Sequence, residues 1–599
     1  MDDAKATTAL LVLLDTAPGG AQRSVPFNSG LTTSKAETAV FLTGDHGFAA
    51  DLATGQVTPL PAGSVATNAA GYDNAVEARL PAALLGGNDA PGVAVAAGVV
   101  NDTGDGFKTL DPSPNVANVA FRTSEPSRDW WDKQQALTLQ QGTIDPFFTT
   151  AGLRAMAAGA NERYLPGPGY HDRIFDSSPT ISHERGQDGV LQHYGLYIPT
   201  SYRPGRPAPL QWWFHFRGGN AHIAAAVAPG IINEMGEDEN SLVVTPDGRG
   251  TSGWYVGVSH VDFLEVWDDV HKLVDVDRNR EYIAGHSMGG WASWLLPILY
   301  PDRFAAAFPA SGPVTQGAWF GCPWDQCYQG TNGGRARDQF TYPLIDNLRW
   351  VPYANYQGAA DELVPAIGVT QQMLHMRDLG YRYQYYVFPH EEHYGPPVFD
   401  QWMEGANYEH QFVRDPNPPQ VTYIRSMPFE RATEQVNSQN VPLSFDFDHA
   451  YWMSDLQPID ATTGVARFDG RSLAIPEDKH ELVPVTGPPA SAQQPDPSVM
   501  SGQAWKDDPG TAPPPRNAFE ATLTGATTVQ LDLQRMRIAT ARPIAGDVTT
   551  QAALRLELTG DWKRTPRATI DGQPATVTRD GRQIALQVPA GHHQVVVAP

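Results

Sequence analysis

The chain has 599 residues, of which 41% are hydrophobic and 18% are charged, and its formal net charge at pH 7 is −24. This length exceeds one domain and predicts about three. The negative charge argues against nucleic acid as a partner, because phosphate binding needs basic patches. No apolar run approaches the roughly 18 residues of a membrane span, so no membrane-spanning helix is predicted.

Residues 1–150 contain short apolar stretches between turn residues, as at 38–42 and 93–100. This pattern predicts an N-terminal β-sandwich. The run 74–81, followed by 84–86, resembles carbohydrate- or cofactor-binding sandwich modules. The apolar run 8–14 has no basic stretch before it, so it predicts a buried strand rather than a signal peptide. The acidic, glycine-rich run 101–106 could hold a structural calcium ion, but it lacks a distant bidentate glutamate, so a solvated turn is favoured.

Residues 151–189 are predicted to be a connecting segment. A strand is then predicted over 210–216, and it runs into a turn rich in glycine. Another apolar strand, 241–244, precedes the loop 245–255. Glycine supplies the positive φ that such strand-to-helix turns require.

A third strand is predicted to end at 282–284, and a buried helix is predicted over 290–296. Between them the chain reads Gly-His-Ser-Met-Gly at 285–289, the pattern of a nucleophile elbow. The serine backbone of such a turn is strained so that its hydroxyl projects, and side chains two residues before and after it would collide. We therefore predict Ser287 as a nucleophile.

Asp361 lies in the loop that leaves a predicted strand at 350–356, 74 residues beyond Ser287. His393 follows the β-prone run 383–388. A serine, an acid and a histidine in this order, each after a later strand, are the pattern of a catalytic triad on a doubly wound sheet. The spacings leave room for the helix and strand units of that sheet.

Two positions have competing neighbours. Glu362 adjoins Asp361, and His390 lies three residues before His393. This histidine spacing differs from that of a zinc-binding H-E-x-x-H motif, which places its histidines four apart. We favour Asp361 as the acid and His393 as the base, because His393 lies further into its loop, where it can reach over the serine.

The region from about 190 to 402 resembles the α/β-hydrolase domains of the prolyl-oligopeptidase and polyhydroxybutyrate-depolymerase/feruloyl-esterase groups. In that family a G-x-x-D-x-x-V-P loop carries the acid, matched here from Gly358 through Asp361 to Pro365. A short turn ending in histidine carries the base, matched best at His393. The resemblance covers about 210 residues of the chain. It implies an α/β-hydrolase fold.

The resemblance also implies an oxyanion hole made of two backbone N–H groups. One donor is the residue after the nucleophile, Met288. The other comes from the loop 215–219, which looks like the His-Gly-rich loop of esterases with Phe216 where glycine is usual. Because of that departure the donor stays open, and we favour the amide of Arg217. Its side chain either holds a substrate carboxylate or braces the loop.

Aromatic residues near these motifs are candidates for lining a substrate groove: Trp254, Tyr255, Trp291 and Trp324. For the loop that holds the first two, a structural brace beside the site is the favoured role, and lining the groove is the alternative. The two cysteines, Cys322 and Cys327, are predicted to form a local disulfide, with two free thiols as the alternative. Two ligands are too few for a structural zinc site, so no metal site is predicted.

The predicted fold class is thus α/β, a doubly wound hydrolase over 190–413 between a sandwich at 1–150 and a β-rich domain at 414–599. Within the last, the proline-rich stretch 484–516 is predicted to be an extended excursion.

The predicted function is a secreted serine hydrolase that needs no cofactor and cleaves carboxylic esters of a polymer, either a polyester or a feruloylated polysaccharide. Its export signal is expected to have been removed. A prolyl-oligopeptidase-like peptidase or amidase is the alternative, although about 150 N-terminal residues are too few for a β-propeller. A binding protein on a degenerate hydrolase scaffold is a third reading. The sequence predicts no oligomeric state.

Overall fold

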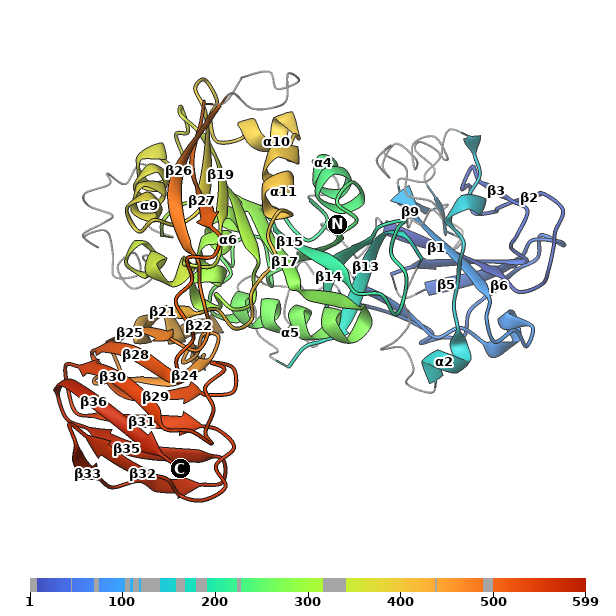
Figure 1. Ribbon diagram of the computed structural model, residues 1–599. Coiled ribbons are helices and arrows are strands. Elements are labelled where there is room, and N and C mark those ends of the chain that lie inside the picture. Colours follow the sequence, from blue (N-terminus) through green and yellow to red (C-terminus); the bar gives the residue numbers. More distant parts are fainter. Residues whose placement is uncertain are drawn as a thin grey trace. The chain divides into compact units, whose positions relative to one another are not determined.

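The computed structural model describes residues 8–44, 46–68, 75–102, 108–110, 118–119, 141–157, 167–178, 191–223, 228–315, 341–436, 439–487 and 499–599 (Figure 1). The chain divides into two compact units. The first comprises Met1–Pro207 with Asp262–Asp275, and the second comprises Ala208–Val261 with Val276–Pro599. Within the described part of the chain, no helix is long and apolar enough to cross a membrane.

The first unit contains an eight-stranded sheet with the order β10-β9-β1-β4-β5-β6, in which β11 and β12 also pair with β9. Strand β1 is apolar along almost its whole length because both of its faces are buried. Leu11 and Leu13 enter one apolar cluster, and Leu14 enters another on the opposite face. The bounds are β1 (Thr8–Asp15), β4 (Thr38–Thr43), β5 (His46–Asp51), β6 (Val57–Pro59), β9 (Gly92–Asp102), β10 (Lys108–Leu110), β11 (Asn118–Val119) and β12 (Thr149–Thr150).

The strands predicted at 8–14, 38–42 and 93–100 are confirmed. Two short hairpins accompany the sheet: β2 (Arg23–Ser24) with β3 (Thr32–Thr33), and β7 (Val65–Asn68) with β8 (Ala75–Ala78). A β-sandwich over 1–150 stays a prediction. Most of the candidate calcium loop lies outside the described residues.

The segment 151–189 is more than a connection. It contains α2 (Leu153–Ala157) and β13 (Gly169–Asp176), and β13 pairs antiparallel with β14 (Leu191–Ile198) over its full length. An ion pair also ties β13 to helix α5 (Val258–Leu273), with Arg173 Nε and Asp269 Oδ2 2.8 Å apart. Strand β13 was not predicted from the sequence because most of its residues are polar.

The second unit contains six parallel strands in the order β16-β15-β17-β18-β19-β20. β16, β18 and β19 are buried at every position, as strands covered on both faces must be. This sheet confirms the α/β class. The bounds are β15 (Ala208–Phe214), β16 (Leu242–Pro246), β17 (Val276–His286), β18 (Ala306–Ala310), β19 (Tyr353–Gly358) and β20 (Tyr383–Phe388), with helices α4 (Gly230–Ile232), α6 (Met288–Leu299), α9 (Ala366–Asp378), α10 (Gly395–Phe399) and α11 (Met403–Glu409). Most of helix α5 (Val258–Leu273) belongs to the first unit.

The proline-rich stretch differs from its prediction. Part of it forms a hairpin, β26 (Lys479–Gly487) with β27 (Val499–Asp508), and β27 pairs antiparallel with β20 at the edge of the parallel sheet (Figure 1). Pro484 is tolerated because β26 is the outermost strand, where a missing N–H costs no ladder bond. The chain therefore returns to the hydrolase sheet after position 414.

Two further sheets make up the C-terminal β-rich part, and their buried residues form one apolar cluster. One sheet runs β21 (Gln420–Ser426), β25 (Val465–Ser472), β28 (Ala518–Thr524), β30 (Ile544–Thr550), β36 (Gly591–Ala598), β32 (Arg567–Ile570), β33 (Gln573–Ala575). The other runs β24 (Met453–Pro458), β29 (Ala526–Asp532), β31 (Leu554–Thr559), β35 (Gln583–Val588), β34 (Thr578–Asp580). Between β21 and β24 in the sequence, β22 (Arg431–Val436) and β23 (Gln439–Ser444) form a separate hairpin.

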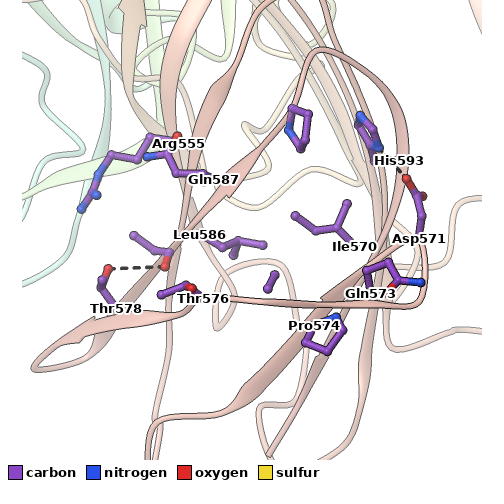
Figure 2. A pocket seen from close by; sticks show the side chains of 13 residues that line it. Arg555, Ile570, Asp571, Gln573, Pro574, Thr576, Thr578, Leu586, Gln587 and His593 are labelled. Carbon is purple, nitrogen blue, oxygen red and sulfur yellow. Dashed lines mark hydrogen bonds and ion pairs between the residues drawn. The ribbon is translucent and has the colours of Figure 1, made fainter.

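Strands of both C-terminal sheets line an open cavity of about 630 Å³ (Figure 2). His593 and Asp571 meet at its rim, where Nδ1 lies 2.7 Å from Oδ2, and the other ring nitrogen lies 3.3 Å from the carbonyl oxygen of Ala590. Arg555 is paired with Glu557 at 2.6 Å. The ionisable side chains of this cavity are therefore engaged within the domain.

Candidate active site

Ser287 lies at the sharp turn between β17 and α6. Its backbone adopts φ 58° and ψ −114°, in the positive-φ region that non-glycine residues seldom occupy. The turn is held by the Ser287 N–H, which donates to the carbonyl oxygen of Ala310 at 2.9 Å, and by the Ser287 carbonyl, which accepts from Trp291 at 2.9 Å. The strained serine predicted from the sequence is therefore observed.

The glycines on either side of the serine have no room for side chains. A methyl group on Gly285 would lie 2.6 Å from the backbone of Gly289 and 2.7 Å from the carbonyl oxygen of Phe214. A methyl group on Gly289 would overlap that same carbonyl. The end of β15 thus packs directly against the start of α6, which brings the loop after β15 next to the serine.

The three side chains predicted to act together lie in one chain of hydrogen bonds. His393 Nε2 lies 2.8 Å from Ser287 Oγ, and Nδ1 lies 2.9 and 3.1 Å from the two carboxylate oxygens of Asp361. Because the carboxylate can only accept, Nδ1 carries the proton and Nε2 is free to accept the serine hydroxyl proton. This is the arrangement in which a histidine can activate a serine.

The competing neighbours do not take part in this chain. Glu362 and His390 are exposed, whereas Asp361 and His393 are 7% and 1% exposed. Burial therefore separates the two candidates at each position.

Asp361 is oriented by groups that the sequence did not reveal. Its Oδ1 accepts the N–H groups of Leu363 and Val364 at 3.0 and 2.7 Å, and its Oδ2 accepts an N–H of Gln357 at 3.1 Å. Gln357 comes from the end of β19 and is fully buried. A glutamine at the end of a strand carries no motif, so sequence reasoning had no signal for it.

The loop after β15 is braced by Tyr255. The Tyr255 hydroxyl accepts the N–H of His215 at 3.0 Å, and the Gly218 N–H donates to the carbonyl oxygen of Thr251 at 2.8 Å. Gly218 has φ +88°, as expected for a glycine turn. The structure thus fixes the loop that contains Arg217, whose side chain is exposed. Met288 opens α6, where first-turn N–H groups have no partner inside the helix.

Two of the aromatic candidates are core residues, which corrects the prediction for them. Tyr255 and Trp291 have no exposed surface, so neither lines a groove. Trp291 donates its ring N–H to the carbonyl oxygen of Trp254 at 3.0 Å, and the Trp254 N–H contacts the sulfur of Met288 at 3.3 Å. Trp254 is partly exposed, so of these three aromatic residues it alone keeps a surface for substrate.

Trp324, Cys322 and Cys327 lie outside the described residues, in the stretch 316–340. The disulfide and the fourth aromatic candidate therefore stay predictions.

Residues 237–412 match the model of the prolyl oligopeptidase family, and this range contains Ser287, Asp361 and His393. A probable feruloyl esterase C of Aspergillus flavus is 28% identical over 134 residues, 21% of this chain and 48% of its own length. An esterase of Mycobacterium tuberculosis is 25% identical over 242 residues, 35% of this chain and 52% of its own length. The chain thus spans about half the length of these curated relatives.

Among solved structures, a fluorophosphonate-binding serine hydrolase of Staphylococcus aureus is 20% identical and has a TM-score of 0.33, covering 41% of this chain and 99% of that chain. This score is too low to carry weight. The family match over residues 237–412 and the curated relatives support an α/β-hydrolase of the prolyl-oligopeptidase and feruloyl-esterase group in this part of the chain. Its curated relatives carry esterase names.

Proposed function

We propose that this protein hydrolyses carboxylic esters through Ser287, His393 and Asp361. The observation that carries the proposal is the 2.8 Å contact of His393 Nε2 with Ser287 Oγ, made while Nδ1 is held by Asp361. A neutral histidine in this state accepts a proton at the atom that faces the nucleophile.

The reaction follows from these contacts. Ser287 Oγ attacks the ester carbonyl carbon as its proton passes to His393 Nε2, and Asp361 stabilises the imidazolium. The Met288 and Arg217 N–H groups receive the oxyanion. The C–O bond then breaks, and the leaving alkoxide takes the proton from Nε2. A water molecule, deprotonated by the same nitrogen, releases the acid and restores the serine. The residues named suffice for every proton transfer, so no cofactor enters the proposal.

The surface beside the base favours an apolar substrate group. Tyr394 follows His393 directly, its ring centroid lies 5.2 Å from that of the imidazole, and it is 44% exposed. Val398 is 74% exposed, and its N–H donates to the Tyr394 carbonyl, which places the two side chains on one helical face. We propose that this face receives the apolar part of the ester. A polymeric substrate and export from the cell are proposed with it.

Peptide hydrolysis is the second candidate, because the matching family model is that of prolyl oligopeptidases. The same triad cleaves amides, with the amine taking the proton from Nε2. Ester cleavage is preferred because the curated relatives described above carry esterase names.

The deciding experiment compares p-nitrophenyl esters with matched p-nitroanilides, using wild type and Ser287→Ala. Ester turnover that disappears in the variant, without anilide turnover, supports the esterase. Anilide turnover comparable to ester turnover makes the peptidase primary. Ester turnover that persists in the variant contradicts the assignment of Ser287.

A further inference from the structure

The x residue of the elbow, His286, lies at the junction of the nucleophile and the base. It is the last residue of β17 and has no exposed surface. Its Nε2 lies 2.8 Å from the main-chain carbonyl oxygen of His393, and the two ring centroids are 4.9 Å apart. Its ring also contacts Phe216, from the loop after β15, at 5.9 Å between centroids. One side chain thus touches the base and the candidate oxyanion loop, from the position next to the serine.

The proton of this ring can be placed from its partner. A carbonyl oxygen only accepts, so Nε2 must carry the proton. Burial, and then the neighbouring His393, lower the pKa of His286 well below its ordinary value, so the ring is neutral. Nδ1 is buried and has no hydrogen-bond partner among the described residues. An unprotonated nitrogen left there is less costly than a buried N–H without an acceptor.

The hydrogen bond from His286 to the His393 carbonyl constrains the main chain of the base, whereas Asp361 contacts only its ring. The Asp361 carboxylate orients the ring of His393 through Nδ1, but it leaves the main chain of the base loop to other contacts. The base loop is also held two residues before His393, where the Ala360 N–H donates to the Glu391 carbonyl at 3.0 Å. The His286 bond is made to the base residue itself and comes from the strand that delivers the nucleophile.

We infer that His286 is a positioning residue, which holds the main chain of His393 so that Nε2 stays within hydrogen-bond reach of Ser287. This inference rests on the proposed function, because it assigns His393 as the base. A neutral donor is required there, since a charged ring beside His393 would oppose formation of the imidazolium. Nothing in the G-x-S-x-G pattern demands a histidine at this place, so the role belongs to this chain's own residue.

The test compares His286→Leu, which fills similar volume without a donor, with His286→Gln, whose side-chain amide can donate from nearly the same place. Two readouts are measured on the full chain: the rate constant of labelling by a fluorophosphonate, and kcat and KM for a p-nitrophenyl ester. We expect His286→Leu to lower the labelling rate and kcat by about 10 to 100-fold, because the buried carbonyl of His393 loses its donor. KM should change less than about twofold, and His286→Gln should recover most of the loss.

Equal losses in both variants, with a lowered unfolding midpoint, would mean that the ring only fills space and would overturn the inference. Two variants as active as wild type would overturn it as well. If neither variant folds, histidine-selective 15N spectra of wild type decide: a His286 ring that gains a second proton between about pH 5 and 8 excludes the neutral donor. A wild type that neither labels nor hydrolyses esters would contradict the proposed function instead, which separates the two failures.

Discussion

The Nε2 atom of His393 lies 2.8 Å from the hydroxyl oxygen of Ser287, although 106 residues separate the two in the chain. β18 and β19 lie between the strands that deliver them, β17 and β20. Parallel strands end at one edge of the sheet, which is where ligands bind in such folds. The base loop must still reach across two strand ends, so its anchors decide whether the contact forms.

Replacing Ser287 by alanine should lower kcat for an ester by about 10⁴ to 10⁶-fold, because no other oxygen can form the acyl-enzyme. Asp361→Asn should cost about 10⁴-fold, because an amide favours the wrong tautomer of His393. Initial rates with a p-nitrophenyl ester check both, with circular dichroism to verify folding.

The exposed neighbours supply matched controls for these variants. Glu362→Gln and His390→Gln alter the same loops but lie outside the hydrogen-bonded chain, so both should keep activity within about twofold. A loss in Glu362→Gln as large as that in Asp361→Asn would transfer the role of the acid to its neighbour.

The elbow glycines should tolerate no side chain. Gly289→Ala would drive a methyl group into the Phe214 carbonyl, so we expect a loss of at least about 1 to 3 kcal/mol of stability, or failure to fold. Chemical denaturation measures this loss. Gly487→Ala is the control, because the nearest atom to its new methyl group, in Met500, is 3.9 Å away. If Gly289→Ala is as stable as this control, the turn can rearrange to accommodate the methyl group, which contradicts the prediction.

Local rules made the elbow, the acid and the base predictable, since each is a short motif whose chemistry fixes its spacing. Five of the six parallel strands were predicted from apolar or β-prone runs, whereas β18, with three alanines and a proline in five residues, was not. The hairpin β26–β27 was not predicted. Its partner strand β20 lies more than a hundred residues earlier, and the composition of the hairpin does not indicate which sheet edge it joins. Burial of an aromatic ring is likewise decided by its neighbours, so Tyr255 suited a groove and a core equally well.

Tyr255→Phe tests the brace on the loop after β15. Without the hydroxyl, the buried N–H of His215 loses its acceptor, which should cost about 1 to 3 kcal/mol. If the loop supplies an oxyanion donor, kcat should fall while KM stays within about twofold. The measurement is ester kinetics beside urea denaturation. A stability loss with unchanged kcat would separate this loop from the chemistry.

The face formed by Tyr394 and Val398 should set the preference for the ester. Tyr394→Ala is expected to raise KM severalfold for long-chain or aromatic esters, and to leave acetate esters nearly unchanged, because only a large group can bury against the ring. Val398→Thr keeps the shape but replaces a methyl group by a hydroxyl. It should also raise KM more for long-chain or aromatic esters than for acetate esters. Equal losses on short and long esters would place the tyrosine in support of His393 rather than of substrate.

The contribution of Glu234 and Asp400 to stability should fall as pH rises from about 5 to 8. Burial is the largest cause that raises the pKa of Glu234 to about 7 and that of Asp400 to about 6. A carboxyl whose pKa is raised by folding contributes stability below its unfolded pKa and loses it as pH rises through the folded value.

Glu234→Gln isolates this effect, because an amide oxygen can still accept the Trp402 N–H that the carboxylate accepts at 2.5 Å. Since Glu234 is partly exposed to solvent, its share of the pH dependence should be about 1 to 2 kcal/mol. Thermal unfolding of both proteins at several pH values measures it. We expect the variant to lose less stability than wild type between pH 5 and 8, and equal losses would place the pH dependence elsewhere.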